Sequence, residues 1–264
     1  MPTLTLLTKV YNNFQLKLVD KNLKSILKGL RVEAKICGVT SRGWMQIALS
    51  GEDETVALRY VTDEIGACPT TLEHVNKFST IKGRITALNK SRDEIYTDIG
   101  VFSPSTVDAA ISLRHLQAQL VDGRKVALEK LVKLFGLCED LPLTVKILNI
   151  DKEKSHIDAM LSEKQLIQYR NWTKSLLDRL IILGSSTFEI RLALKDAGLN
   201  RDVVNIESLG LFEHALLCKL GTDAAGLIPK IGKKLRNATF SIFNPKEFLE
   251  FLRDSDWANY CSLR

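Results

Sequence analysis

The chain has 264 residues, of which 45% are hydrophobic and 26% are charged, and its formal net charge is +6. This length allows two or three compact domains, and the composition allows packed cores and excludes a wholly disordered chain. No apolar run approaches the ~20 residues of a membrane-spanning helix, and the apolar start is too short for a signal peptide. We therefore expect a cytoplasmic protein with no membrane partner.

Positive charge is concentrated in two segments of the chain. Residues 1–35 hold seven Lys and Arg against two acids, and residues 80–136 hold nine against six. An excess of this kind is the electrostatic footprint of contact with polyphosphate. The five cysteines are scattered, without a C-x-x-C pair or a local Cys/His cluster, so we expect buried thiols in a reducing compartment and no metal or other cofactor.

Residues 1–78 predict a ferredoxin-like α+β unit. A strand near the N-terminus is followed by an amphipathic helix capped by Asp20, and the segments RVEAKICGVT and WMQIALSG predict two strands joined by a short turn. EDETVALRYVTDEIG has acids in its first turn and Gly66 at its end, as a helix does. The resulting order β-α-β-β-α is typical of the ferredoxin-like fold.

Residues 79–138 predict a β-barrel unit of OB/S1 type with two following helices. The stretch TIKGRITALNKSRDEIYTDIGV alternates apolar and polar residues on either side of a polar turn, which is the pattern of a hairpin. Helical periodicity follows in SLRHLQAQL and RKVALEKLVKLFG. The segment from Cys138 to Pro142 has the composition of a linker.

Residues 139–264 predict a C-terminal α+β unit. A strand pair precedes a long helix from Ser162 to about Leu183, on which Trp172 is expected to anchor the core. After a shorter helix, the sequence predicts a hairpin, a short helix, a strand and a last helix that begins at Pro245.

The hairpin in the second unit carries a candidate RNA-binding face. Its two strands resemble the opening strands of an S1/OB barrel, in which Gly83 permits a bend and β-branched residues line the interior. If Ile95 points inward, Tyr96 points outward, because neighbours on a strand face opposite sides. The candidates for phosphate contact and base stacking are Lys82, Arg84, Lys90, Arg92, Tyr96 and Phe102. The alternative is a solvated basic face on an ordinary hairpin.

A second stretch, residues 203–232, also resembles part of an S1 domain. Phe212 is the aromatic residue that maps onto the family pattern, whereas Pro229 stands where the family has a His that faces RNA. The densest basic cluster of the chain follows and consists of Lys230, Lys233, Lys234 and Arg236. These residues either clamp phosphates or form the solvated face of a short helix.

We assign no catalytic residues from the sequence. The glycines over 221–232 do not fit a phosphate-binding loop. After Gly226 the motif needs Lys, but the chain has Leu227; after Lys233 the motif needs a hydroxyl residue, but the chain has Lys234. His214 lies beside Glu213 and could form an acid–base pair, but a single His in a strand is more often a structural residue.

The runs CKLGTDAAGLIPKIG, QLVDGR and LFGLCEDLPL resemble an archaeal family known only as a domain of unknown function, and the resemblance extends over most of the chain. It implies an archaeal cytoplasmic source and transfers no activity. The predicted function is non-enzymatic RNA binding in translation or RNA processing, with single-stranded or ribosomal RNA as the partner. Two alternatives remain: a protein–protein adaptor in a ribosome or transcription assembly, with acidic residues 52–73 as its surface, and a nucleotide- or RNA-acting enzyme whose site is assembled from distant residues.

Overall fold

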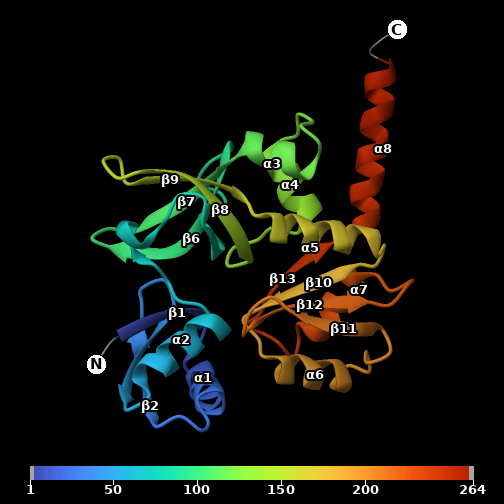
Figure 1. The fold of residues 1–264 in the computed structure, drawn as a ribbon. Coiled ribbons are helices and arrows are strands. Elements are labelled where there is room, and N and C mark those ends of the chain that lie inside the picture. The colour runs from blue at the N-terminus through green and yellow to red at the C-terminus, as the bar shows by residue number, and fades with distance from the viewer. Residues whose placement is uncertain (1–2, 262–264) are drawn as a thin grey trace. The chain divides into compact units, whose positions relative to one another are not determined.

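The computed structural model of the protein describes residues 3–261, which form an α+β fold (Figure 1). Two compact units share the chain. The first contains the residues up to Asn76 together with Ile99–Asp108, and the second contains Lys77–Asp98 together with the residues from Ala109 onward. No helix within residues 3–261 is long and apolar enough to cross a membrane.

The N-terminal sheet has the strand order of a ferredoxin-like fold, as predicted. Its elements are β1 (Thr3–Lys9), α1 (Asn13–Ile26), β2 (Val32–Val39), β3 (Trp44–Gly51) and α2 (Glu54–Glu64). The sheet order is β1-β3-β2 with antiparallel neighbours, so β3 lies between the two strands that α1 connects. On the other edge of β1, Ala67 forms an isolated antiparallel bridge with Leu6, and the Cys68 amide donates to the Thr5 carbonyl at 2.8 Å. This bridge takes the position of the fourth strand of the fold.

Helix α1 begins earlier than the sequence prediction placed it. The Asn12 side chain caps the helix by accepting a hydrogen bond from the Gln15 amide at 3.2 Å, whereas Asp20 lies within the helix. The buried face consists of Gln15, Val19 and Leu23, which have helical spacing.

A closed five-stranded barrel follows and has the topology of an OB fold. Its strands are β5 (Thr80–Thr86), β6 (Glu94–Ser103), β7 (Val107–Ser112), β8 (Pro142–Asp151) and β9 (His156–Leu161). The sheet order β6-β5-β8-β9-β7 is closed by pairing of β6 with β7, and the β7–β9 pair is parallel. The short elements β4 (Thr70–Thr71), which pairs with β6, and η1 (Leu72–His74) precede the barrel, and helices α3 (Leu113–Leu120) and α4 (Leu128–Phe135) connect β7 to β8.

The barrel extends further along the chain than the predicted boundary after residue 138. Strands β8 and β9, which the sequence analysis placed in the C-terminal unit, pair with β5 and β7. The segment from Cys138 to Pro142 is part of the barrel rather than a linker: Leu141 is buried, its carbonyl accepts from the Ile85 amide at 3.0 Å, and the Asp140 amide donates back to Ile85 at 2.9 Å.

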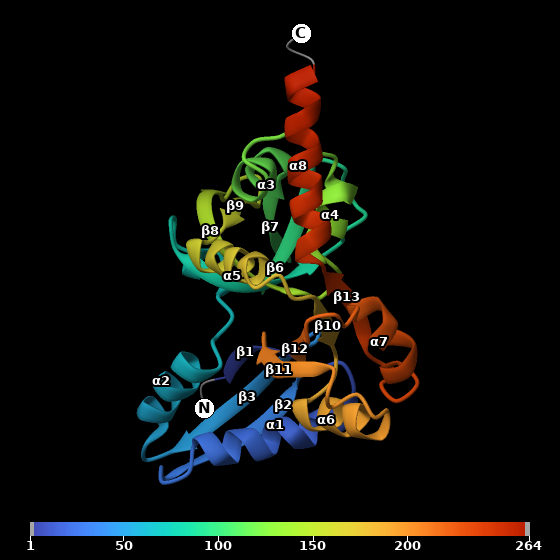
Figure 2. The ribbon, with the colours of Figure 1, turned by 90° about the vertical axis from the view of Figure 1, so that its right-hand side faces the viewer.

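The C-terminal sheet is a second ferredoxin-like arrangement, complete with four strands. After α5 (Glu163–Lys174) come β10 (Arg179–Leu183), α6 (Thr187–Asp196), β11 (Val203–Ser208), β12 (Glu213–Cys218), α7 (Ala224–Ile231), β13 (Thr239–Phe243) and α8 (Pro245–Cys261). The order β11-β12-β10-β13 with the sequence β-α-β-β-α-β defines the fold. Figures 1 and 2 show α5 on one side of this sheet and α6 on the other.

The prediction of a long helix from Ser162 to about Leu183 is therefore correct as far as Lys174 and wrong beyond it. The helix ends at Lys174, and the run Arg179–Leu183, apolar after its first residue, is the central strand β10, buried along its whole length between β12 and β13. A short continuous apolar run fits a buried helix and a buried strand equally well, and only the pairing distinguishes them.

Candidate nucleic-acid interface

The loop between β5 and β6 presents two cations at the surface of the second unit, and the adjoining start of β6 presents one aromatic ring. Ile85 and Ile95 are fully buried inside the barrel, and Tyr96 points the opposite way and is partly exposed, as the alternation predicted. Lys90 and Arg92 are exposed. The Lys90 Nζ lies 5.0 Å from the centroid of the Tyr96 ring, and the Tyr96 hydroxyl donates to the Glu94 carboxylate at 2.9 Å. The ring is thus held at the surface by one cation and one hydrogen bond.

A second polar loop of the barrel connects β8 to β9. It exposes Lys152 and Lys154, and the Lys154 ammonium lies 3.9 Å from the Asp151 carboxylate. In OB folds the loop between strands 1 and 2 and the loop between strands 4 and 5 flank the ligand-binding face, which is on strands 2 and 3. The sequence predicts a strand pair here, but its assignment to the C-terminal unit instead of the barrel left both lysines out of the predicted site.

The prediction that Arg84 lies at the surface is wrong. Its side chain is buried, and one guanidinium nitrogen lies 2.9 Å from the Glu213 carboxylate and 3.2 Å from the Asp140 carbonyl oxygen. Because β5 packs against β12 at this point, the outward face of the strand is an interior face within the second unit. In this conformation Arg84 does not meet a phosphate.

Lys82, two residues earlier on the same face of β5, is partly buried. Its ammonium group donates to the Leu209 carbonyl oxygen at 2.5 Å. Burial lowers the pKa of Lys82 below its ordinary value; Glu213 opposes this effect, and the positive charges of Arg84 and Lys164 add to it. Lys82 therefore belongs to an interior cationic site rather than to the loop surface.

The far half of β6 and the start of β7 are covered by other residues of the first unit. A Cβ atom on Gly100 would lie 2.5 Å from the Cys68 sulfur, so only a glycine allows this approach, and Arg42 forms a two-pronged ion pair with Asp108. Phe102 is partly buried in this region. The open part of the strand β6 face is consequently the half that bears Tyr96.

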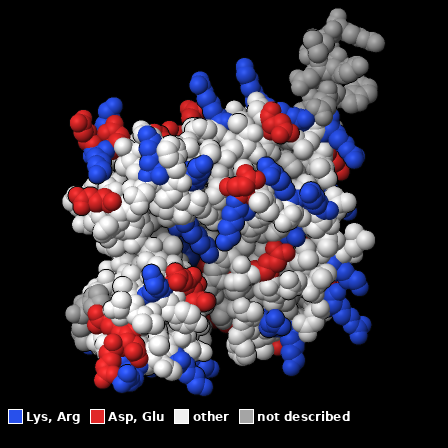
Figure 3. Space-filling model, viewed as in Figure 1, with Lys and Arg blue, Asp and Glu red and all other residues white. Residues whose placement is uncertain are grey.

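The residues predicted from the second S1-like stretch lie on the C-terminal sheet and its helices. Residues 203–232 form β11, β12 and α7 rather than barrel strands, and Phe212 is buried with 1% exposure, so it offers no stacking surface. The exposed cations at and beyond the end of α7 are Lys230, Lys233, Lys234 and Arg236. Lys234 pairs with Asp196 at 3.6 Å. On the face drawn in Figure 3, basic and acidic side chains are interspersed. The candidate RNA contacts on this face are therefore individual groups of cations and not one continuous basic surface.

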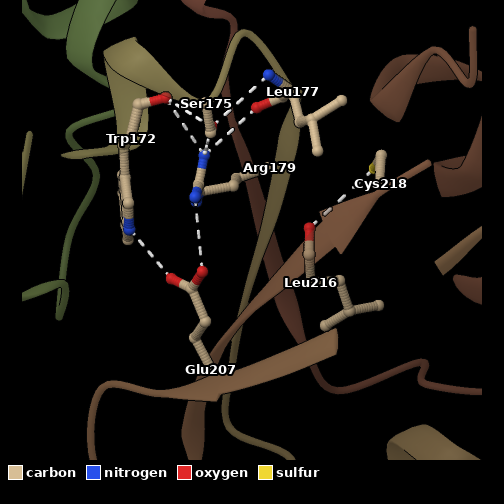
Figure 4. A network of polar contacts seen from close by, with 7 residues as sticks. All are labelled: Trp172, Ser175, Leu177, Arg179, Glu207, Leu216 and Cys218. Atoms are coloured by element: carbon tan, nitrogen blue, oxygen red, sulfur yellow. Dashed lines mark hydrogen bonds and ion pairs between the residues drawn. The ribbon is translucent and has the colours of Figure 1, made fainter. Parts of the chain in front are cut away.

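Trp172 connects α5 to the C-terminal sheet through a polar network (Figure 4). Its indole N–H donates to one oxygen of Glu207 at 2.8 Å, and Arg179 donates to the other at 3.3 Å. The Arg179 guanidinium also donates to the Ser175 hydroxyl and to the carbonyls of Trp172 and Leu177. Trp172 is buried, with Tyr169 and Phe243 against its ring, so it anchors the core as the sequence analysis expected.

Among the described cysteine side chains, Cys68 and Cys218 are buried as the sequence predicted, whereas Cys138 is half-buried and Cys37 is exposed. Burial raises the pKa of Cys138 to about 12 and that of Cys218 to about 11. Among the side chains that the structure describes, no group of three His, Cys, Asp or Glu is arranged to hold a metal ion.

Three family models match the chain in order: the DUF2110 N-terminal domain over residues 3–71, the central domain over 75–173 and the C-terminal domain over 177–243. The chain matches none of the curated proteins. It is similar to the structure of an uncharacterized protein from Methanocaldococcus jannaschii, with 16% identity, a TM-score of 0.24, and coverage of 34% of this chain and 95% of that one. It is also similar to the a/eIF2alpha–aDim2p–rRNA complex from Pyrococcus horikoshii, with 14% identity, a TM-score of 0.26, and coverage of 49% and 70%. The three matched ranges correspond to the first ferredoxin-like sheet, the barrel with α5, and the second ferredoxin-like sheet.

Proposed function

We propose that the chain, which belongs to the DUF2110 family, is a non-enzymatic RNA-binding protein that binds single-stranded RNA at the exposed half of its OB barrel. The observation that carries the proposal is the placement of Lys90 over the ring of Tyr96, with Arg92 exposed in the same loop between the first two barrel strands. OB folds bind oligonucleotides at this loop and on the adjoining strand.

The chemistry of these groups suits an unpaired strand. Lys90 and Arg92 supply charge for two phosphates, and the face of Tyr96 supplies a platform on which a base stacks, whatever its identity. Lys152 and Lys154 on the β8–β9 loop provide a second phosphate contact across the face. Binding of this kind depends on salt and is tolerant of sequence, which fits a role in translation or RNA processing.

The exposed cations at the end of α7 extend the proposal to a second contact. Lys230, Lys233 and Arg236 would meet the phosphates of a longer RNA without reading its bases. Because they lie on a different element from the barrel loop, their contribution is separable by RNA length.

The test measures binding of a 5′-labelled single-stranded 12-mer RNA by fluorescence anisotropy across a KCl titration. Replacing both Lys90 and Arg92 by Ala removes two phosphate contacts, so the slope of log K against log salt should become shallower by about 1.4. Tyr96→Ala should weaken binding by about 1–3 kcal/mol, and Tyr96→Phe should retain most of the affinity because the ring face remains.

The matched control is the double substitution Lys17→Ala with Lys21→Ala, which removes the same charge from the exposed side of α1. This variant should keep the wild-type slope and affinity. Equal losses in the control and the loop variant, or no binding by the wild type at low salt, would overturn the proposal.

A further inference from the structure

A cavity of about 510 Å³ lies in the second unit where β5, α5 and the β11–β12 connection meet. Its volume falls within the range of small-molecule sites, about 300–1,000 Å³. Its polar lining includes Lys82, Lys164, Gln168, Asn171, Arg179 and Glu207. Barrel, helix and C-terminal sheet all contribute, so the site exists only in the folded second unit.

The cavity carries an excess of positive charge. Lys82 and Lys164 both line it, and the positive charge of Lys164 is one of the influences that lower the pKa of Lys82. Of the described lining residues, only Glu207 is acidic, and its two oxygens already accept from Trp172 and Arg179 (Figure 4). Two ammonium groups therefore line one cavity whose acidic lining residue is already paired. Glu213, which does not line the cavity, offsets part of the charge at Lys82, and the positive charge that remains would stabilise an anion between the two lysines.

Arg179, a buried residue of the cavity wall, has one N–H that no described group satisfies. This lining residue is only 3% exposed, and its Nε atom has no hydrogen-bond partner among the described residues, although the outer nitrogens have several. A buried N–H without a partner is costly, and a ligand oxygen would satisfy it once a side-chain shift opens the buried Nε atom to the cavity. The amide side chains of Gln168 and Asn171 add further polar groups to the same wall.

We propose that this cavity binds a phosphate monoester of about mononucleotide size, with Lys82 and Lys164 holding the phosphate. Lysine ammonium groups form strong charge-assisted hydrogen bonds to phosphate oxygens. Gln168 and Asn171 would meet the polar groups of the esterified part. The monoester comes from one of two sources, a free nucleotide or the 5′-phosphorylated end of an RNA. The site is distinct from Lys90, Arg92 and Tyr96 and does not depend on the proposed function.

The experiment is isothermal titration calorimetry on the full chain with adenosine 5′-monophosphate, with adenosine as the neutral probe. Adenosine 5′-monophosphate should bind and adenosine should bind far more weakly. Lys82→Met and Lys164→Met should each reduce affinity by about tenfold, the value of one charge-assisted hydrogen bond. Lys164 is exposed, so its replacement leaves the fold intact even if Lys82→Met perturbs it. The matched control is Lys174→Met, which lies on the same helix outside the cavity and should change affinity less than twofold.

A second readout is the pH profile between pH 7 and 10. The phosphate contact needs a protonated Lys82, and the pKa of this group lies below its ordinary value of 10.5. The affinity should therefore fall as the pH rises through that lowered pKa. In Lys82→Met this decline should be absent.

A parallel titration uses two 12-mer RNAs that differ only in a 5′-phosphate or a 5′-hydroxyl. Tighter binding of the phosphorylated RNA, sensitive to Lys164→Met, with no binding of adenosine 5′-monophosphate, supports the same cavity and identifies the RNA end as the source. Failure of both adenosine 5′-monophosphate and the 5′-phosphate to bind, or binding unaffected by both cavity variants, would overturn the inference. The 5′-hydroxyl RNA can bind only at the barrel loop. Its failure to bind would therefore contradict the proposed function without contradicting the cavity site.

Discussion

The two ferredoxin-like sheets of this chain have the same strand order but very different exposure. The edge strands β2 and β11 are exposed in both sheets, and the difference lies in the central strands: in the first sheet only three of the seven residues of β1 are buried. In the second, every residue of β10 is buried, and so are most residues of β12. The comparison teaches that the fold fixes which strands are neighbours, whereas the elements packed on each face decide the sheet's chemistry.

One face of the second sheet is a conventional apolar core. Leu180 and Ile182 of β10 and Leu216 of β12 pack against α6 and α7 through Ile190 and Leu227. This is the arrangement expected when two helices cover one side of an antiparallel sheet.

The other face of the second sheet is covered by the barrel and its helices. Phe243 of β13 lies in an aromatic cluster with Phe135 of α4 and with Tyr169 and Trp172 of α5. Ferredoxin-like RNA-binding domains stack bases on this face of their sheet. Here this face is covered by other side chains of the same unit, so it offers no open surface on which a base could stack.

The first helices of the two sheets begin alike despite this difference. Asn13–Leu18 reads NFQLKL and residues 187–192 read TFEIRL, each after a capping side chain from Asn12 or Ser186. In both, the Phe in the second position is exposed, at 82% for Phe14 and 74% for Phe188. The shared local pattern determines where each helix begins and leaves its Phe side chain exposed. It does not determine which elements cover the opposite face of the sheet.

The largest expected effect comes from breaking the buried ion pair on the covered face of the second sheet. Arg84→Met leaves Glu213, which is fully buried, without its cation, and should lower the free energy of unfolding by about 3–5 kcal/mol. The control Lys35→Met on the open first sheet should change it by less than about 0.5 kcal/mol. Urea unfolding curves measure both, and similar losses from the two variants would contradict the comparison. Replacing both Arg84 and Glu213 by Met should recover much of the loss, because no unpaired charge remains.

A smaller effect is expected from crowding the same face at Gly210. A Cβ atom there would lie 1.9 Å from a Glu213 carboxylate oxygen, and Arg84 holds that carboxylate in place. Gly210→Ala should therefore cost about 1–3 kcal/mol of stability. Gly226→Ala in α7 is the matched control, since its nearest neighbour would be 3.8 Å away, and it should stabilise by roughly 0.5–1 kcal/mol. Thermal unfolding of the two variants should move in opposite directions, and a shift in the same direction would count against a tightly packed second face.

The smallest effect concerns pH. His214 on β12 is buried beside Thr187, and burial lowers its pKa below the ordinary value of 6.5, despite the opposing influence of Glu213. The unfolded chain then takes up the proton more readily than the folded one, so stability is complete above pH 6.5 and decreases as the pH falls below it, by at most about 1.4 kcal/mol per pH unit. His214→Asn should remove this part of the acid dependence. An unchanged pH profile in urea titrations between pH 5 and 7.5 would assign the acid dependence to other groups.

The sequence by itself determined the elements whose signals are local. The β-α-β-β-α order of the first unit and the hairpin with Ile95 inside and Tyr96 outside follow from periodicity and turn residues over a few positions, and the structure contains both. The exposure of the loop cations Lys90 and Arg92 could also be predicted locally, because the polar residues of a turn between two strands stay in contact with solvent.

Only the tertiary structure decided which strand faces are covered. Arg84 and Lys90 are equally basic in the sequence, yet Arg84 is buried against Glu213, and Lys82 meets a carbonyl 127 residues away. The strand identity of Arg179–Leu183 and the membership of β8 and β9 in the barrel likewise rest on pairing with distant segments. Contacts between segments so far apart leave no periodic trace in either one, because each segment keeps its own hydrophobic pattern whichever partner covers it.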